Sequence, residues 1–166
     1  KQQVIFHPHF LKEYNNRWFL WGDLEKEDGT IFEAYNYSID RIDQGSLKEL
    51  NDNNYRPKAP SFYLNLFKDI VGVTIPKDKK KERIIIETLD EKVHGLMKSK
   101  PIHWSQKEIK NYVGKEQTGK FELHLIPNIE FFGNVLHYGK AIRIIEPLSI
   151  KEEIKKIIEE MIKAYM

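Results

Sequence analysis

The chain has 166 residues, of which 40% are hydrophobic, enough for one ordinary domain or two small ones with a buried core. Its 27 basic and 25 acidic residues leave a net charge of +2 and are interspersed, so an anion site must be local. The sequence has no cysteine and no apolar run of membrane-spanning length, which excludes disulfides and thiolate catalysis and favours a cytoplasmic protein without a membrane anchor.

The first forty-odd residues predict small all-β structure. Segments of strand composition occupy residues 3–6, 17–23 and 30–40, and residues 13–16 and 25–29 between them are rich in turn formers. Because proline limits strand pairing, we expect the first strand to end at Pro8.

A polar connector follows. Residues 46–61 are rich in Asn and Pro, and helical spacing then appears ahead of Gly72, at Tyr63, Leu66, Phe67 and Ile70. We assign residues 1–44 to a first domain, 45–76 to a linker with a short helix, and 77–166 to a second domain.

The second domain alternates strand and helix patterns. Residues 83–89, 101–109, 120–126 and 140–145 read as strands, and residues 120–126 place Phe121, Leu123 and Leu125 on one face. Thr88 and Glu91 form a capping-box pair ahead of a helix. A second helix, closed by Gly139, carries the apolar stripe Ile129, Phe132, Val135 and Leu136.

The resulting order, β-α-β-β-α-β, is that of a ferredoxin-like domain, in which two helices cover one face of an antiparallel sheet. A last helix follows, for which we expect Ser149 as the cap and Glu152 as its capping-box partner. It carries a wide apolar stripe that must dock on something, formed by Ile150, Ile154, Ile157, Ile158, Met161, Ile162 and Tyr165. We therefore expect a homodimer.

No motif indicates catalysis, a metal or a cofactor. His7 and His9 share one strand face, but no third ligand stands at a known spacing, and the other histidines are scattered. The sequence has no glycine-rich phosphate loop, nucleophile elbow or paired carboxylates, so we expect no enzyme. The lysine-rich residues 77–81 are typical of a solvated turn.

The strand at residues 17–23 concentrates the unusual chemistry. Alternation places Arg17, Phe19 and Trp21 on one face and Trp18 and Leu20 on the other. An arginine beside aromatic planes can hold bases and phosphates. The alternative is that the aromatic side chains fill a barrel and Arg17 forms a surface ion pair.

Longer motifs resemble those of a known family. "HPHFLKEYNNRWFLWGD", followed by "YSIDRI", resembles the WYL domain of bacterial transcriptional regulators, whose Trp-Tyr-Leu triplet reads Trp18-Phe19-Leu20 here. "KPIHWSQ" and "IPNIEFFGNVLHYG" resemble the C-terminal extension of the same regulators. The resemblance spans nearly the whole chain.

The resemblance implies an α+β architecture, with part of an Sm-like or SH3-like β-barrel joined to a ferredoxin-like βαββαβ extension with a C-terminal helix. It implies that duplex DNA is bound only through a helix-turn-helix upstream of Lys1, together with at least one barrel strand. The effector is expected to be a nucleotide or single-stranded nucleic acid. The matching ligand-binding residues are Arg17, Trp18, Phe19, Arg41, His9 and Tyr14. A purely structural dimerisation module without a ligand is the alternative.

Overall fold

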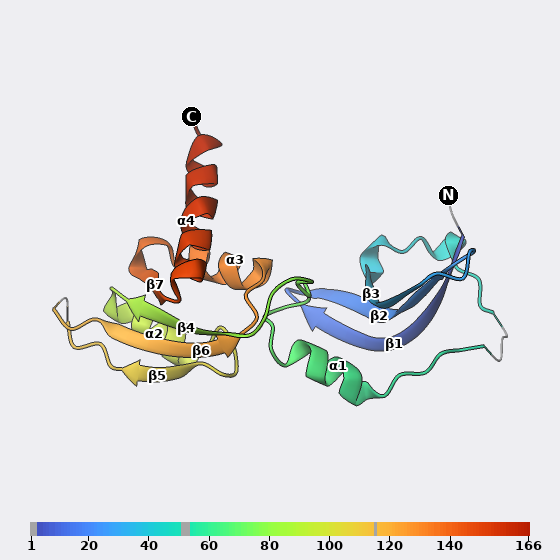
Figure 1. Ribbon diagram of the computed structural model, residues 1–166, viewed down its shortest axis with the longest axis horizontal. Helices are drawn as coiled ribbons and strands as arrows, with labels where there is room; N and C mark the ends of the chain where they lie inside the picture. The colour runs from blue at the N-terminus through green and yellow to red at the C-terminus, as the bar shows by residue number, and fades with distance from the viewer. Residues whose placement is uncertain (1–2, 51–53, 115) are drawn as a thin grey trace. The chain divides into compact units, whose positions relative to one another are not determined.

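The computed structural model describes residues 3–50, 54–114 and 116–166. Within these residues the fold is mixed α+β, as predicted, with four α-helices and seven strands in two antiparallel sheets (Figure 1). The chain divides into two compact units, Lys1–Leu66 and Phe67–Met166. This boundary lies inside the span 45–76 that the sequence analysis assigned to a linker. No helix of the described parts is both long and apolar enough to cross a membrane.

The first unit is a three-stranded sheet of order β1-β2-β3, with β1 at Val4–Tyr14, β2 at Arg17–Lys26 and β3 at Ile31–Ser38. Asn15 and Asn16, with φ of 50° and 58°, form the tight turn between β1 and β2. Asparagine tolerates this left-handed conformation, which matches the twist of a hairpin. Helix α1 follows at Pro60–Phe67.

Two bulges interrupt this sheet. The prediction that the first strand ends at Pro8 is wrong. Strand β1 continues past this residue, with a register shift between Pro8 and Phe10. Proline has no backbone amide to donate to the neighbouring strand, and a bulge tolerates such a residue, so the strand can continue through Pro8. The second shift lies between Gly22 and Leu24 of β2, opposite Ala34, whose φ is 51°.

Tyr63 of α1 forms the centre of the first unit's core. Its side chain is fully buried, and its ring stacks on Phe10 at 5.4 Å and meets the edge of Trp21 at 6.4 Å. Helix α1 therefore covers one face of the sheet through a residue more than fifty positions away from Phe10, its contact in β1. Strand β3 ends at Ser38 and does not reach residue 40, contrary to the prediction from the sequence, because residues Ile39–Arg41 form the 3-10 turn η1.

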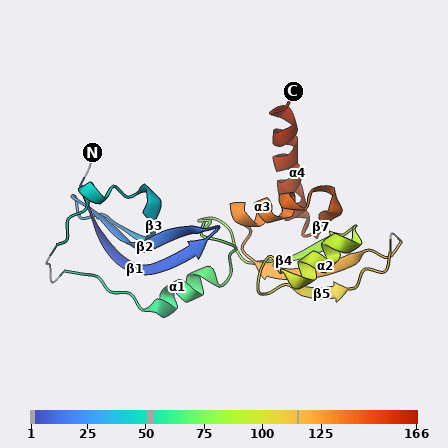
Figure 2. The same cartoon turned by 180° about the vertical axis from the view of Figure 1, so that it is seen from behind.

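The second unit contains a four-stranded antiparallel sheet of order β5-β6-β4-β7. Figure 2 shows it from behind, with α2 in front of the strands. The predicted order β-α-β-β-α-β is confirmed. The elements are β4 (Glu82–Thr88), α2 (Glu91–Ser99), β5 (Lys107–Lys110), β6 (Gly119–Leu125), α3 (Ile129–His137), β7 (Ile142–Glu146) and α4 (Leu148–Lys163).

One apolar core holds the second unit together. Phe121, Leu123 and Leu125 of β6 point into it, as predicted, and meet Met97 of α2 and Phe131 of α3. The opposite face of the sheet is charged: the Nε of Arg83 lies 2.6 Å from Glu122, and that of Arg143 lies 2.6 Å from Glu87. The sheet therefore has one covered face and one polar face.

The structure corrects the predicted helix starts. Asp90, not Thr88, caps α2, because its carboxylate accepts from the Val93 backbone amide at 3.0 Å. Helix α4 starts at Leu148 with Pro147 in the cap position, so Ser149 lies inside the first turn and makes no cap. Proline is well suited to a helix start, because the first backbone amides of a helix have no acceptor within it and proline has no amide hydrogen to leave unpaired.

Two smaller predictions in the second unit are also wrong. On α3 the exposed Ile129 does not enter the core, and Phe131 is buried instead. Of the predicted strand 101–109 only the last three residues belong to β5 (Lys107–Lys110), because the indole of Trp104 donates to the Lys68 carbonyl at 2.6 Å and the residues around it turn. The predicted solvated turn at residues 77–81 is confirmed, because these residues form no helix or strand and are exposed; within it Lys79 forms an ion pair with Glu153.

Candidate ligand-binding face

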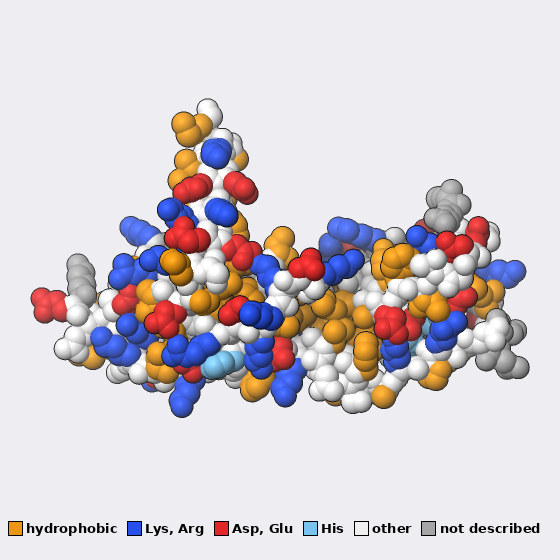
Figure 3. Space-filling view, in the orientation of Figure 1, with side chains coloured by type: hydrophobic (Ala, Val, Ile, Leu, Met, Phe, Trp, Pro, Cys, Tyr) orange, Lys and Arg blue, Asp and Glu red, His pale blue; other side chains and the backbone are white. Residues whose placement is uncertain are grey.

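The first unit's sheet leaves one face without the cover of α1. Cross-strand pairs such as Leu20 with Tyr37 and Gly22 with Tyr35 set which side chains share this face. We define the aromatic face as Phe6, Leu11, Trp18, Leu20, Phe32, Tyr35 and Tyr37. Hydrophobic side chains also reach the surface over the strands of this unit in the space-filling view (Figure 3).

The rings of the aromatic face contact one another. Tyr37 lies 5.2 Å from Phe6 and 5.1 Å from Tyr35, measured between ring centroids. Lys26 places its ammonium 4.7 Å from the centroid of Phe32, a cation–π contact. Burial raises the pKa of Tyr37, with a further contribution from Tyr35, so its hydroxyl remains a hydrogen-bond donor at neutral pH.

This face is open at its edges. Trp18 is 53% exposed, and Leu11, Phe32 and Tyr35 are also exposed. Exposed aromatic planes on a sheet offer stacking surfaces to unpaired bases, and a neighbouring lysine offers a contact to phosphate. The arrangement can therefore hold a flat, anionic ligand without any catalytic group.

Two arginines lie at one end of β2. The Nε of Arg17 is 3.4 Å from a carboxylate oxygen of Asp40, and both side chains are about half exposed. Ser38 donates to Asp40 at 2.7 Å, and this hydrogen bond, helped by Arg17 and Arg41, holds the pKa of Asp40 below its usual range. Arg41 is exposed and has no ion-pair partner among the described residues. Arg17 must leave Asp40, or share it, before it can bind a ligand anion.

The structure separates the other residues that the sequence analysis grouped. Trp18 lies opposite Glu13 on the aromatic face, whereas Arg17 and Phe19 lie on the face that α1 covers, with Arg17 opposite Tyr14. Trp18 and Arg41 are accessible, while Tyr14 and Phe19 are half-buried. The six predicted site residues therefore do not form one cluster.

His9 has a structural position. Its Nδ1 lies 2.8 Å from the hydroxyl of Tyr63, and its Nε2 contacts the Arg56 carbonyl. Both ring nitrogens are thus engaged within the unit. This histidine links β1 to α1 and to the segment before it.

Sequence reasoning missed a charge cluster in the first unit that is centred on a buried aspartate. Asp23 is almost fully buried, and Lys58 lies 3.1 Å from it and 2.8 Å from Glu33. Asp23 also accepts from the Ala34 amide that the second bulge exposes, at 3.3 Å. The local pattern contained no signal for this cluster, because its members are separated by up to 35 residues.

A hydrogen-bonded row in the second unit resembles a nucleophile, base and acid. The Thr88 hydroxyl lies 2.8 Å from Nδ1 of His94, and Nε2 of His94 lies 2.9 Å from Glu108, which Lys98 contacts at 2.7 Å. Thr88 is fully buried, so no substrate can reach its hydroxyl. The row fixes β4, α2 and β5 to one another.

In the described parts of the chain, no three His, Asp or Glu side chains are grouped closely enough to hold a metal ion. No model of a known protein family matches the sequence. A search of curated proteins also finds no match.

Proposed function

We propose that the chain is the effector-sensing and dimerisation part of a bacterial DNA-binding transcriptional regulator of the WYL type, and that its first unit binds a nucleotide or single-stranded nucleic acid. The observation that carries this proposal is the open aromatic face, with Trp18 at its edge and Arg41 close to the start of β2. Aromatic stacking combined with a forked cation suits unpaired bases with phosphates.

We also propose that the first unit is part of an Sm-like or SH3-like barrel and that the second unit is a ferredoxin-like extension. Three bulged, antiparallel strands are compatible with part of an Sm-like or SH3-like barrel. The strand order β5-β6-β4-β7 of the second unit supports a ferredoxin-like extension. In a regulator of this type, duplex DNA is read by a separate helix-turn-helix and not by these two units.

Fluorescence anisotropy with labelled single-stranded oligonucleotides at low and high salt tests the ligand proposal. We expect weak binding that falls with salt, because phosphate contacts release counterions. Trp18→Ala should cost about 1–3 kcal/mol, the usual value for one stacked base. Arg41→Ala should weaken binding roughly tenfold, and Lys48→Ala, an exposed lysine of the same unit, should change it less than about twofold. Absence of binding at low salt would refute the sensor function.

A purely structural module is the second candidate, and the Arg17–Asp40 ion pair favours it. If both arginines serve the fold, Arg17→Ala should lower the melting temperature and leave oligonucleotide affinity per folded molecule unchanged. If Arg17 binds the effector, Asp40→Asn should instead strengthen binding, because it releases the guanidinium from its competitor. The two variants together distinguish sensor from scaffold.

A further inference from the structure

The last helix overhangs a groove. Helix α4 extends away from the sheet, and hydrophobic side chains lie along its projecting half (Figures 1 and 3). Ile150 and Ile154 are buried in the core, whereas three apolar residues of the second half, Ile158 (43%), Met161 (46%) and Ile162 (55%), and Tyr165 (91%), two residues past the helix end, are exposed. Together with α3 and the edge strand β7, this half of α4 forms a largely apolar groove of about 870 Å³.

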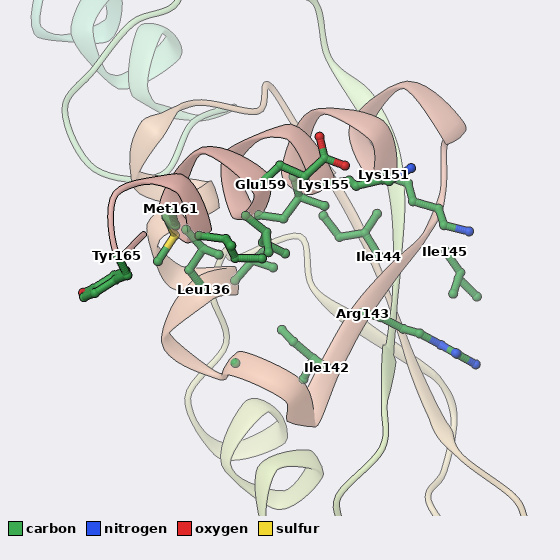
Figure 4. Close-up of a pocket in the computed structure, with 15 residues that line it drawn as sticks. Leu136, Ile142, Arg143, Ile144, Ile145, Lys151, Lys155, Glu159, Met161 and Tyr165 are labelled. Carbon is green, nitrogen blue, oxygen red and sulfur yellow. The ribbon is translucent and has the colours of Figure 1, made fainter.

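Figure 4 shows that this groove extends along α4 and the turn after it, from Lys151 to Tyr165. Ile158 is the midpoint of that span. Two cationic residues, Lys151 and Lys155, lie on the N-terminal side of Ile158, and the acidic Glu159 and the aromatic Tyr165 lie on its C-terminal side. A second copy of the same helix, lying antiparallel along this groove, would therefore bring its acidic and aromatic residues next to these lysines.

We propose that the groove is filled by α4 of a second copy of this chain, and that the two α4 helices cross antiparallel at Ile158. In this register Ile158 faces its own counterpart on the two-fold axis, and Lys151 faces Tyr165 of the other copy in cation–π geometry. Lys155 of each copy lies near Glu159 of the other, so the two-fold axis produces this contact twice. The two helix dipoles run antiparallel, which is favourable. Glu153 does not disturb the pairing, because Lys79 of its own chain already neutralises it.

The exposed area supports a second copy as the occupant. With about 200 Å² for a fully exposed side chain of this size, the four exposed residues present roughly 450 Å² per copy. Two copies thus contribute about 900 Å² before the flanking charges and the β7 wall are counted, which approaches the lower bound of about 1,200 Å² for a specific interface. The same element supplies both the protruding and the receiving surface, as an isologous contact requires.

This inference rests on the dimerisation part of the proposed function and names its surface. Sedimentation of the 166-residue chain should show a concentration-dependent dimer. Ile162→Glu should weaken it more than tenfold, whereas Lys156→Glu, on the outer side of α4, should leave it unchanged. Circular dichroism of each variant confirms that the fold is retained.

Charge reversal tests the antiparallel pairing. Lys155→Glu alone and Glu159→Lys alone should each weaken the homodimer about tenfold, because each places like charges in both symmetric contacts. Mixing these two variants should restore a dimer, since every contact is again opposite in sign. A mixture that stays monomeric overturns the register.

Crosslinking provides a test that does not depend on affinity. The chain has no cysteine, so single-cysteine variants report one position each. Ile158→Cys should form a disulfide dimer, Tyr165→Cys alone should not, and a mixture of Lys151→Cys with Tyr165→Cys should. Crosslinking of Tyr165→Cys with itself would indicate parallel helices and refute the proposal.

The outcomes separate the surface from the function. A wild-type monomer at all concentrations would remove dimerisation from the proposed function as well as this surface. A dimer that survives Ile162→Glu would refute the α4 surface alone. Oligonucleotide binding measured on the same samples reports the sensor function independently.

Discussion

Replacement of Tyr63 by alanine should strongly destabilise the first unit and leave the second unit folded. The ring of Tyr63 is fully buried, stacks on Phe10, and holds α1 against the sheet, while its hydroxyl lies 2.8 Å from His9. Burial raises the pKa of Tyr63 to about 12, with Asp23 and Glu33 adding to it, so the hydroxyl is protonated and available as a donor at any physiological pH.

The expected magnitudes follow from this environment. Tyr63→Phe removes the hydroxyl and its hydrogen bond, which should cost about 0.5–1.5 kcal/mol. Tyr63→Ala leaves a cavity the size of the ring and should cost about 3–5 kcal/mol. A unit of 66 residues has a total stability on the order of 3–10 kcal/mol, so the alanine variant removes a large part of it.

Urea titration followed by tryptophan fluorescence measures these changes. In a Trp104→Phe background the remaining indoles, Trp18 and Trp21, report only the first unit. His9→Ala should lose about as much stability as Tyr63→Phe and leave oligonucleotide affinity unchanged, which would assign His9 to the scaffold. A Tyr63→Ala variant less than about 1 kcal/mol weaker than its parent would refute the anchoring role of this residue.

Three further predictions concern contacts within each unit. His94→Leu should destabilise the second unit by about 2–4 kcal/mol because it leaves the buried Thr88 hydroxyl unpaired, and adding Thr88→Val should recover about 1–2 kcal/mol in a double-mutant cycle followed by calorimetry. Hydrogen bonds from Lys98 and His94 lower the pKa of Glu108. Its contribution to the stability of the second unit is therefore complete at neutral pH and is lost as pH falls below the ordinary carboxyl range. Glu108→Gln should flatten this part of the acid unfolding curve. A Cβ at position 22 would lie 2.1 Å from the backbone oxygen of His7, so Gly22→Ala should cost about 3 kcal/mol or more in urea titration, and a neutral result would contradict the close approach of β1 and β2.

Local patterns predicted the elements well where the element's own period decides its structure. Phe121, Leu123 and Leu125 alternate without interruption, and all three are buried in β6. Asn15 and Asn16 form the turn that their tolerance of positive φ indicates. In both places the deciding interactions lie within a few residues of each other.

Long-range partners explain the wrong predictions. Thr88 is of a residue type that often caps helices, but it is the last residue of β4 and its hydroxyl contacts His94. Asp90 caps α2 instead. Ser149 lies two positions past the cap position of α4, because the cap is Pro147 and the helix already starts at Leu148. Neither position can be found without knowing where the preceding strand leaves the sheet.

The candidate site was only partly predictable for the same reason. The strand at Trp18 was recognisable from its composition, but the other aromatic residues of that face come from β1 and β3, and two bulges break the alternation that would have grouped them. The partner of Arg17, Asp40, is 23 positions away. The α4 stripe was visible in the sequence, whereas the point at which the core stops covering it was not.

The position of Tyr63 in the chain has a consequence for synthesis on the ribosome. Strands β1 to β3 are complete at Ser38, yet the ring that covers their inner face arrives 25 residues later, at Tyr63. At about 5–20 residues per second, the sheet waits roughly one to five seconds with Phe10 and Trp21 uncovered. During that interval the nascent chain presents an apolar surface that molecular chaperones recognise, so the order of elements makes this half of the protein dependent on protection before α1 emerges.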